Sequence, residues 1–322
     1  MHNPAFIINP LSHSVAKNGS ILQKTGFTTS NNCTFLHGFE TLPAVVDTVL
    51  NSGKKHVFIE GGDGTIHGVL SAFLNQQPDV SKLPDFTLLP GGMTNLVAGH
   101  VGLKQPSIKK LTKLINGTYT PKIVELPMLA VKSSGKSSGK SSGNERVHYG
   151  FLFSTGALPI ATRYCLDHVH TKGVDGSAAV RSTLLKVLLG RGPEREAILA
   201  PTPLSLDIGN MKTDGDHIVM IATTLPSLMI GLKPFWGKGD KPLMITHAGK
   251  DARHIKRNLA RMLLPGQSAR ARAALKRDGF QSWDVDQAEI CLKGETVLDG
   301  EFLPRTHAPI SLYATKPLRF IK

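Results

Sequence analysis

The sequence predicts two domains, an N-terminal α/β domain with a parallel sheet and a C-terminal domain made mainly of β-strands. Over the first 125 residues short apolar runs alternate with helix-like segments, an order typical of a parallel sheet with helices on its faces. Beyond this point most apolar runs have the length of strands. We expect a first domain at residues 1–125, a second at 126–313, and a tail at 314–322 that can pack back on the first.

Four apolar runs predict the strands of the first domain. They cover residues 5–8, 33–36, 56–59 and 86–89. Helices are expected at residues 40–50 and 65–74, where apolar side chains recur at helical spacing. Parallel sheets bind ligands at the loops that follow the carboxyl ends of their strands. The residues after Ile59 and after Leu89 are therefore the first candidates for a binding site.

Five further runs predict strands in the second domain. They cover residues 128–131, 147–153, 217–223, 288–292 and 310–314. Between the first two lies a segment, residues 132–143, that consists of three copies of Lys-Ser-Ser-Gly. Because it is too polar and too rich in glycine to bury a core, we interpret it as a disordered hairpin insertion. A phosphorylated or nucleic-acid-binding arm is the alternative.

Composition limits the class of protein. The three cysteines are far apart and form no C-x-x-C pair, which indicates a reducing compartment. No signal peptide is recognised, and the most apolar stretch, residues 218–232, contains Pro226 and is shorter than the ~18–20 residues that span a bilayer. We expect a soluble cytoplasmic protein. The formal net charge of +14 favours an anionic partner such as a nucleotide, a nucleic acid or a membrane surface.

A glycine-rich loop follows the predicted strand that ends at Ile59. Its residues are Gly61, Gly62, Asp63, Gly64 and Thr65, and an amphipathic helix begins directly after them. Glycines let the backbone approach a ligand closely, and a helix N-terminus offers N–H groups and partial positive charge. The pattern outlines a phosphate site. Taken alone, it also fits a tight turn with Thr65 as the helix N-cap.

The same pattern recurs after the next strand, in residues 90–95 (Pro-Gly-Gly-Met-Thr-Asn), which open another helix. Together the motifs resemble the diacylglycerol kinase catalytic-domain family, which includes bacterial lipid kinases, sphingosine kinases and ceramide kinases. Four segments carry the resemblance, in the family's order: residues 9–12 (Asn-Pro-Leu-Ser), residues 61–65, residues 90–98 and residues 299–301 (Asp-Gly-Glu).

The resemblance implies an N-terminal domain like that of NAD kinases and a C-terminal β-sandwich that binds the lipid substrate. It also implies ATP as phosphate donor and Mg²⁺ as cofactor. The residues expected to contact the nucleotide are Asn9, Gly61, Gly62, Gly64, Thr65, Gly92, Thr94 and Asn95. Asp299 is the expected general base, Glu301 its partner for Mg²⁺ or for positioning, and Asp63 a metal ligand or an orienting group. From the residues alone, Asp299-Gly300 also fits a hairpin turn.

Several positions depart from the family pattern. His13, Gly68, Met93 and Leu96 stand where the family usually has Gly, Glu, Thr and Asp. The changes at Gly68 and Met93 each remove a polar group near the expected phosphate site, and Thr94 is a possible substitute. A divergent enzyme is favoured over a nucleotide-binding pseudokinase that acts as a sensor or scaffold, because the glycines, Asp63 and Asp299 are all present. An NAD kinase is the closest enzymatic alternative.

The second domain holds further candidates. Gly156 resembles the small glycine-containing turn at the family's acceptor site, whereas Asp167, His168 and His170 lack further metal ligands and are read as a solvated loop. Basic residues concentrate in residues 180–191 and 253–277, and residues 226–236 are apolar and aromatic. These segments suit either a membrane interface or helices that pack on the second domain. Nucleic acid is not expected, because no aromatic stacking motif accompanies the charge.

The sequence therefore predicts an ATP-dependent lipid kinase that docks on anionic membranes and phosphorylates a diacylglycerol-like or sphingoid hydroxyl. It gives neither the identity of the lipid nor the oligomeric state.

Overall fold

A computed structural model describes residues 3–133, 147–170, 192–228, 232–237, 239–263 and 268–322. Its internal contacts divide the chain into two compact units. Unit 1 comprises Met1–Met128 and Lys316–Lys322, and unit 2 comprises Leu129–Thr315. Most of the predicted 132–143 insertion lies outside the described residues. Lys132 and Ser133, predicted to belong to it, instead end a strand of unit 2.

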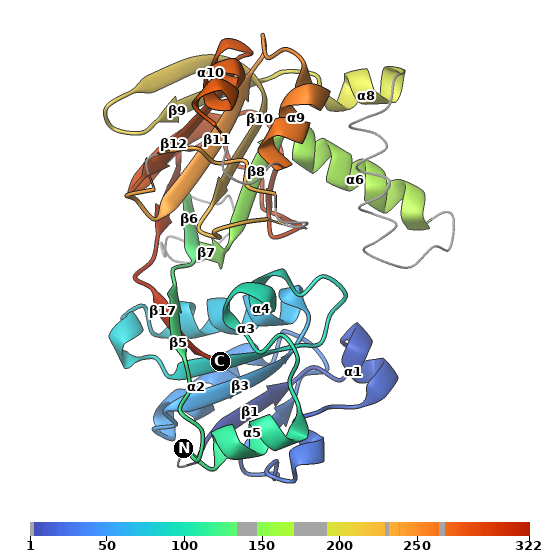
Figure 1. The fold of residues 1–322 in the computed structure, drawn as a ribbon, viewed down its shortest axis with the longest axis vertical. Helices are drawn as coiled ribbons and strands as arrows, with labels where there is room; N and C mark the ends of the chain where they lie inside the picture. Colours follow the sequence, from blue (N-terminus) through green and yellow to red (C-terminus); the bar gives the residue numbers. More distant parts are fainter. Residues whose placement is uncertain (1–2, 134–146, 171–191, 229–231, 238, 264–267) are drawn as a thin grey trace. The chain divides into compact units, whose positions relative to one another are not determined.

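Unit 1 is a six-stranded sheet with helices on both faces (Figure 1). Its strands are β1 (Ala5–Ile8), β2 (Cys33–Phe35), β3 (His56–Gly61), β4 (Asp85–Pro90), β5 (Ile123–Leu126) and β17 (Leu318–Ile321). Its helices are α1 (His13–Asn18), α2 (Leu42–Asn51), α3 (Asp63–Gln76), α4 (Leu96–Val101) and α5 (Ile108–Ile115), with short 3₁₀ helices η1 (Gln23–Thr25) and η2 (Val80–Lys82). The predicted α/β class is confirmed.

The strand order of unit 1 is β2-β1-β3-β4-β17-β5. The first five strands in this order pair in parallel and only β5 is antiparallel to its neighbour. The C-terminal segment therefore forms β17 between β4 and β5, where the Thr87 hydroxyl donates a 3.0 Å hydrogen bond to the Ile321 carbonyl. Because the parallel strands share one direction, the loops after β1, β2, β3 and β4 all emerge at the same edge of the sheet.

Alternating strand residues bury the two faces of this sheet. Phe6, Ile8 and Phe58 pack on α1 and α5 through a cluster that includes Val15 and Leu111. On the opposite face α3 packs on β4, with the rings of Phe73 and Phe86 edge to face at 5.2 Å. With both faces covered, β3 is buried along its whole length. Function at this sheet is therefore restricted to its edges and loops.

Unit 2 is an eleven-stranded antiparallel sheet with four described helices. Its strands are β6 (Leu129–Ser133), β7 (Val147–Gly150), β8 (Leu152–Gly156), β9 (Thr202–Asp207), β10 (Lys212–Thr223), β11 (Leu243–Gly249), β12 (Phe280–Val285), β13 (Gln287–Leu292), β14 (Thr296–Leu298), β15 (Glu301–Phe302) and β16 (Ile310–Ala314). The helices are α6 (Ala157–His170), α8 (Pro193–Ile198), α9 (Ile255–Leu263) and α10 (Ala269–Arg277).

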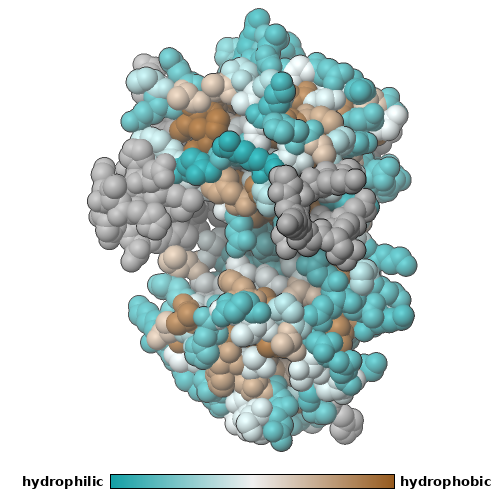
Figure 2. Space-filling model, turned by 180° about the vertical axis from the view of Figure 1, so that it is seen from behind, coloured by the Kyte–Doolittle hydropathy of each residue, from teal (hydrophilic) through white to brown (hydrophobic). Residues whose placement is uncertain are grey.

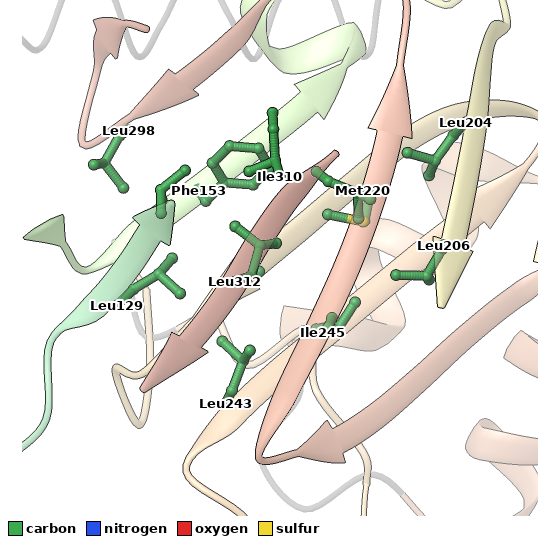
Figure 3. Close-up of a cluster of buried hydrophobic side chains, with 14 residues drawn as sticks. Leu129, Phe153, Leu204, Leu206, Met220, Leu243, Ile245, Leu298, Ile310 and Leu312 are labelled. Carbon is green, nitrogen blue, oxygen red and sulfur yellow. The ribbon is translucent and has the colours of Figure 1, made fainter. Parts of the chain in front are cut away.

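The sheet of unit 2 branches at β10. The first half of β10 pairs with β9, and its second half pairs with both β8 and β11. The two arms then pack face to face, because Leu243 and Ile245 of β11 share one buried cluster with Leu129 of β6 and Leu312 of β16 (Figure 3). The predicted mainly β second domain is confirmed, as two layers around a common core.

One predicted strand is two strands. Residues 147–153 read as a single run, but β7 ends at Gly150 and β8 begins at Leu152. β7 pairs with β6, whereas β8 pairs with β10 and β14. The break at Phe151 turns the chain from one part of the sheet to another, and this change of partner leaves no mark in the apolar pattern.

Candidate active site

The loops after β1, β3 and β4 meet at the carboxyl edge of the unit 1 sheet. The Gly91 N–H donates to the Gly61 carbonyl at 2.8 Å, and the Ser14 N–H donates to the Gly91 carbonyl at 2.8 Å. The Gly62 N–H donates to the Ser12 hydroxyl at 3.2 Å. Three segments predicted from separate motifs therefore form one hydrogen-bonded cluster, which we call the glycine crevice (residues 9–14, 61–65 and 90–95).

Glycine is required where the β3 and β4 loops touch. A Cβ on Gly91 would lie 2.8 Å from the Gly61 Cα, and one on Gly92 would lie 2.7 Å from the Gly62 Cα. Real Cβ atoms do not approach backbone this closely, so a side chain at either position would push the loops apart. The contact between the two loops thus explains the glycines at 91 and 92, and at Gly62 a Cβ would lie 3.2 Å from the Gly92 Cα. At Gly61 a Cβ would instead lie 2.6 Å from the Thr65 side chain of the same loop.

Gly64 has a different explanation. A Cβ built on this residue meets nothing within 4 Å, and its backbone is not in the left-handed region. Gly64 is exposed in the first turn of α3, where alanine would be the better helix former. Neither packing nor backbone geometry therefore requires glycine here.

The N-terminus of α3 presents its backbone N–H groups to the glycine crevice. The first hydrogen bond of the helix runs from the Ile66 N–H to the Gly62 carbonyl, and no side chain caps the helix. The N–H groups of Asp63, Gly64 and Thr65 therefore precede the intrahelical ladder. With the partial positive charge of a 14-residue helix, they form an anion-binding arrangement.

The two asparagines predicted to contact the nucleotide are engaged within the protein. Asn9 donates through Nδ2 to the Thr65 hydroxyl at 2.8 Å, and its Oδ1 accepts the Leu11 N–H at 2.9 Å. Asn95 accepts the Gly92 N–H at 2.8 Å and donates to the Gly92 carbonyl at 2.7 Å. In this structure both asparagines shape the loops, and Thr94 lies part-exposed between Met93 and Asn95.

Asp63 is oriented by the next helix. Its Oδ1 accepts the Val97 N–H of α4 at 3.2 Å, which ties the start of α3 to the start of α4. One oxygen is thereby fixed, and the carboxylate stays part-exposed at the crevice. Asp63 is the carboxylate that the sequence predicts for the site, and it lies in the first turn of α3.

Glu60, the residue before the glycines, anchors residues 20–22 through its carboxylate. Its side chain is 4% exposed and accepts hydrogen bonds from the Ser20 hydroxyl at 2.5 Å, the Ile21 N–H at 2.9 Å and the Leu22 N–H at 3.2 Å. A buried acid is costly unless its oxygens are satisfied in this way. The motifs do not indicate this role of Glu60, although an acid at the end of an otherwise apolar strand is a signal for it.

Two departures from the family pattern have visible consequences. A Cβ on Gly68 would lie 3.0 Å from the ring of Phe39, so this ring occupies the space next to the helix where the family has a glutamate. Met93 is 49% exposed and Leu11 69% exposed, which gives the crevice two apolar side chains on its surface. Of the other two departures, His13 begins α1 and Leu96 begins α4.

The Asp299 turn lies in unit 2. Asp299 and Gly300 have φ of 51° and 95° between β14 and β15, as a tight hairpin turn requires. The carboxylate accepts the Phe151 N–H at 2.9 Å and the Leu152 N–H at 2.8 Å. The prediction of a hairpin turn is correct. A turn and a catalytic role are compatible, because the turn fixes the Asp299 carboxylate in place and Glu301, two residues later, is exposed.

Gly156 cannot carry a side chain. Its φ is 77°, and a Cβ would lie 2.3 Å from the Ile218 carbonyl oxygen and 3.1 Å from His217 Nε2. Beside it, His217 and His247 are buried with ring centroids 6.0 Å apart. Burial lowers the pKa of His247 to about 4 and also lowers the pKa of His217. Both imidazoles are thus held neutral near neutral pH.

Other sequence candidates fall outside the described part of the chain. The side chains of Asp167, His168 and His170 are not described, nor are residues 180–191 and 229–231. Among the described residues no three His, Cys, Asp or Glu side chains gather as a metal cluster, and no described helix is long and apolar enough to cross a membrane.

Comparisons with known proteins agree with this geometry. A model of the diacylglycerol kinase catalytic domain matches residues 6–124. A solved diacylglycerol kinase from Bacillus anthracis str. Sterne is 13% identical with a TM-score of 0.58, covering 99% of this chain and 96% of that chain. Yeast NADH kinase complexed with NADH is 12% identical with a TM-score of 0.52, covering 99% and 83%.

No curated protein matches the chain. At this low identity the solved structures establish the fold, whereas the family model covers the segment that contains the whole glycine crevice. Residues 6–124 thus match the model of the diacylglycerol kinase catalytic domain, and over its full length the chain has the fold of a diacylglycerol kinase and of NADH kinase.

Proposed function

We propose that this protein is an ATP-dependent lipid kinase that transfers the γ-phosphate of ATP to the hydroxyl of a diacylglycerol-like or sphingoid lipid. The observation that carries the proposal is the α3 N-terminus, where exposed Gly64 leaves room for a phosphate beside N–H groups that precede the helix ladder. Phosphoryl transfer asks a protein mainly for positioning and for neutralisation of charge. The glycine crevice would supply both.

The residues of unit 1 fit a bound Mg²⁺. This ion usually binds through one or two carboxylates, the substrate phosphates and several waters, so a site with few acids suits it. Asp63 would hold it, since its carboxylate is oriented by the Val97 N–H and remains part-exposed. By the family resemblance, Glu301 of unit 2 is a second candidate ligand. Bound at Asp63, Mg²⁺ would neutralise phosphate charge.

The acceptor hydroxyl needs a base, for which we propose Asp299. Its carboxylate accepts two backbone N–H groups, which hold the side chain in one orientation. A positioned base typically contributes ~10²–10⁴-fold in rate. Gly156 and the start of α6 would form the acceptor turn of the same unit.

Membrane docking through α9 and α10 is the second part of the proposal. Their apolar side chains include Met262 and Leu275, which are buried against Phe280 and Ala248, so the helices pack on the sheet and expose mainly charge. The basic side chains of residues 253–277, which include these helices and the two residues before α9, are Arg253, His254, Lys256, Arg257, Arg261, Arg270, Arg272, Lys276 and Arg277. On the face shown in Figure 2, apolar residues form separate patches within a mostly hydrophilic surface.

The buried carboxylate of Asp278 binds several side chains of the basic region at residues 253–277. Asp278 accepts hydrogen bonds from Asn258 at 2.9 Å and Arg257 at 3.1 Å, and it lies 3.4 Å from Arg261. The hydrogen bond from Asn258 and the charge of Arg257 lower the pKa of this carboxyl. A single acid thus fixes several cations that would face anionic lipid headgroups, at about 1 kcal/mol for each basic side chain near the surface.

The test is acceptor-dependent ADP release with the Asp299→Asn variant. Asn tolerates the left-handed backbone and can keep one oxygen toward the Phe151 and Leu152 N–H groups, so the hairpin should persist. We expect kcat to fall by ~10²–10⁴-fold with unchanged ATP affinity. Full turnover by the variant would remove Asp299 from the mechanism. A wild type that binds ATP but transfers nothing would favour the sensor alternative.

A further inference from the structure

One arginine of α6 contacts the residue before the hairpin that carries Asp299 and Glu301 and also the last residue of that hairpin. Arg163 donates through Nε to Glu295 Oε2 at 3.0 Å and through a terminal nitrogen to Oε1 at 2.5 Å. Glu295 directly precedes β14. The same guanidinium lies over the ring of Phe302, with Cζ 4.4 Å from the centroid, and Phe302 ends β15. The planar guanidinium of arginine can bind a carboxylate through two nitrogens and stack on an aromatic ring at the same time, and the ammonium group of lysine cannot make both contacts.

The two halves of the hairpin are held differently. Asp299 is anchored from β8, through the Phe151 and Leu152 N–H groups, and Gly150 leaves room for its carboxylate because a Cβ there would lie 2.8 Å from Oδ2. Glu301 is exposed and belongs to a strand of only two residues. The position of Glu301 therefore depends on its neighbour Phe302, and Phe302 is covered by Arg163.

The helix that supplies Arg163 also begins at the predicted acceptor turn. α6 starts at Ala157, directly after Gly156, which ends β8 and pairs with Val219 of β10. Arg163 is six residues into this helix, so about 9 Å of rigid helix connects the turn to the hairpin clamp. This length of helix keeps the acceptor turn at Gly156 and the hairpin at Asp299 at a constant separation.

We propose that Arg163 is a positioning residue of the kinase site, which holds Glu301 relative to Asp299 and ties the hairpin to the acceptor turn. The inference rests on the proposed function, because the hairpin matters for rate only if Asp299 and Glu301 act in phosphoryl transfer. Arg163 acts through Glu295 and Phe302. The ion pair also lowers the pKa of the Glu295 carboxyl, chiefly through the hydrogen bond from Arg163, which keeps the clamp ionised at neutral pH.

Arg305 provides a matched control. It donates to the same Glu295 Oε1 at 2.9 Å, but its side chain is 76% exposed, against 52% for Arg163. An exposed ion pair contributes little to stability. Arg305→Gln therefore removes one positive charge from the same carboxylate without removing the guanidinium that stacks on Phe302.

The experiment compares Arg163→Gln, Arg163→Lys and Arg305→Gln for kcat, for KM toward ATP, and for hydrogen exchange of the peptide that spans residues 296–303. We expect both Arg163 variants to lose about 10- to 100-fold in kcat, since misplacement of a group by about 1 Å has effects of this size. KM for ATP should stay within about twofold, because binding of ATP belongs to unit 1. Arg305→Gln should retain turnover within about twofold.

A second pair of variants separates positioning from general loss of structure. Phe302→Leu keeps an apolar residue but removes the ring, and combined with Arg163→Gln it should add little further loss, because both changes break the same contact. Faster exchange at residues 296–303, with an unchanged thermal unfolding midpoint, is the structural signature of a loosened hairpin.

Unchanged kcat in Arg163→Gln, or an equal loss in Arg305→Gln, would overturn the inference. If wild type transfers no phosphate to any acceptor, the proposed function fails, and the exchange measurement still decides the structural claim. Unchanged exchange in Arg163→Gln would then show that Arg163 does not hold the hairpin.

Discussion

Gly64→Ala separates the requirements of folding from those of binding at the glycine crevice. The added Cβ meets no protein atom within 4 Å, and the backbone there suits alanine. Alanine is favoured over glycine within a helix by about 0.5–1 kcal/mol, so the variant should be as stable as wild type or slightly more so. For a domain of this size such a gain raises Tm by roughly 2–4 °C at most.

The same methyl group should weaken ATP binding. It projects beside the N–H groups that would hold a phosphate, and losing one hydrogen bond to a charged group costs about 1.5–3 kcal/mol. This corresponds to about 10- to 150-fold in Kd. Gly99→Ala is the matched control, because Gly99 also lies in a helix, also has open space at its Cβ position, and is outside the crevice.

Isothermal titration with ATP and Mg²⁺, together with thermal unfolding, measures both quantities on the same samples. The expected result is a folded Gly64→Ala protein with weak ATP binding and a Gly99→Ala protein that binds like wild type. Wild-type affinity in Gly64→Ala would refute the assignment of the α3 N-terminus as the phosphate site. Equal weakening in both variants would point to a general effect of the substitution.

Three further predictions follow from buried and charged groups. Glu60→Gln places an amide against the Ile21 and Leu22 N–H groups, so the free energy of unfolding measured by chemical denaturation should fall by about 1–3 kcal/mol. An unchanged denaturation midpoint would mean that the carboxylate does not anchor residues 20–22. Folding lowers the pKa of His247 from 6.5 to about 4, so the unfolded protein binds this proton more tightly at acidic pH. The free energy of unfolding should therefore be highest above pH 6.5 and fall by about 2 kcal/mol by pH 5. His247→Leu should flatten that dependence, and a profile identical to wild type would assign it to other groups. Sedimentation with anionic vesicles should decline steeply from low to physiological salt, with weaker binding in an Arg270→Gln/Arg272→Gln variant, whereas equal binding to neutral vesicles would reject electrostatic docking.

The order of elements in unit 1 could be predicted from the sequence, because each element carries its own periodic apolar pattern. The loop at residues 61–65 and the loop at 90–95 were found from glycines at strand ends, and the parallel direction of β3 and β4 then brings them together. Residue types also gave the hairpin at Asp299, since Asp-Gly is a favoured turn.

Partners distant in sequence could not be predicted. β17 enters the sheet between β4 and β5 after more than 190 intervening residues, and the sequence offered only the possibility that the tail packs back. Asn9 and Asn95 were expected to face a ligand, but a motif gives residue types and not hydrogen-bond partners. The contacts of Arg163 with Glu295 and Phe302 depend on how α6 lies against β14 and β15, which no local pattern records.

The sequence also does not show which glycines are required by packing and which face open space. In the sequence Gly62, Gly64, Gly91 and Gly92 read alike, as loop residues that allow close approach. The structure shows that Gly91 and Gly92 are needed because two backbones touch and that Gly62 is tightly packed, while Gly64 alone of these faces open space. Distinguishing the two reasons requires the neighbouring loop in position.

The most direct test of the lipid kinase proposal follows the label from γ-labelled ATP. Purified protein is incubated with labelled ATP, Mg²⁺ and, in parallel, diacylglycerol, sphingoid base, ceramide, monoacylglycerol, prenol and NAD, and the products are separated by extraction and chromatography. We predict label in a phosphorylated lipid of the organic phase, at a rate that Asp299→Asn lowers by ~10²–10⁴-fold. Label recovered in NADP, with none in any lipid, would contradict the proposal and assign the chain to the NAD kinase type.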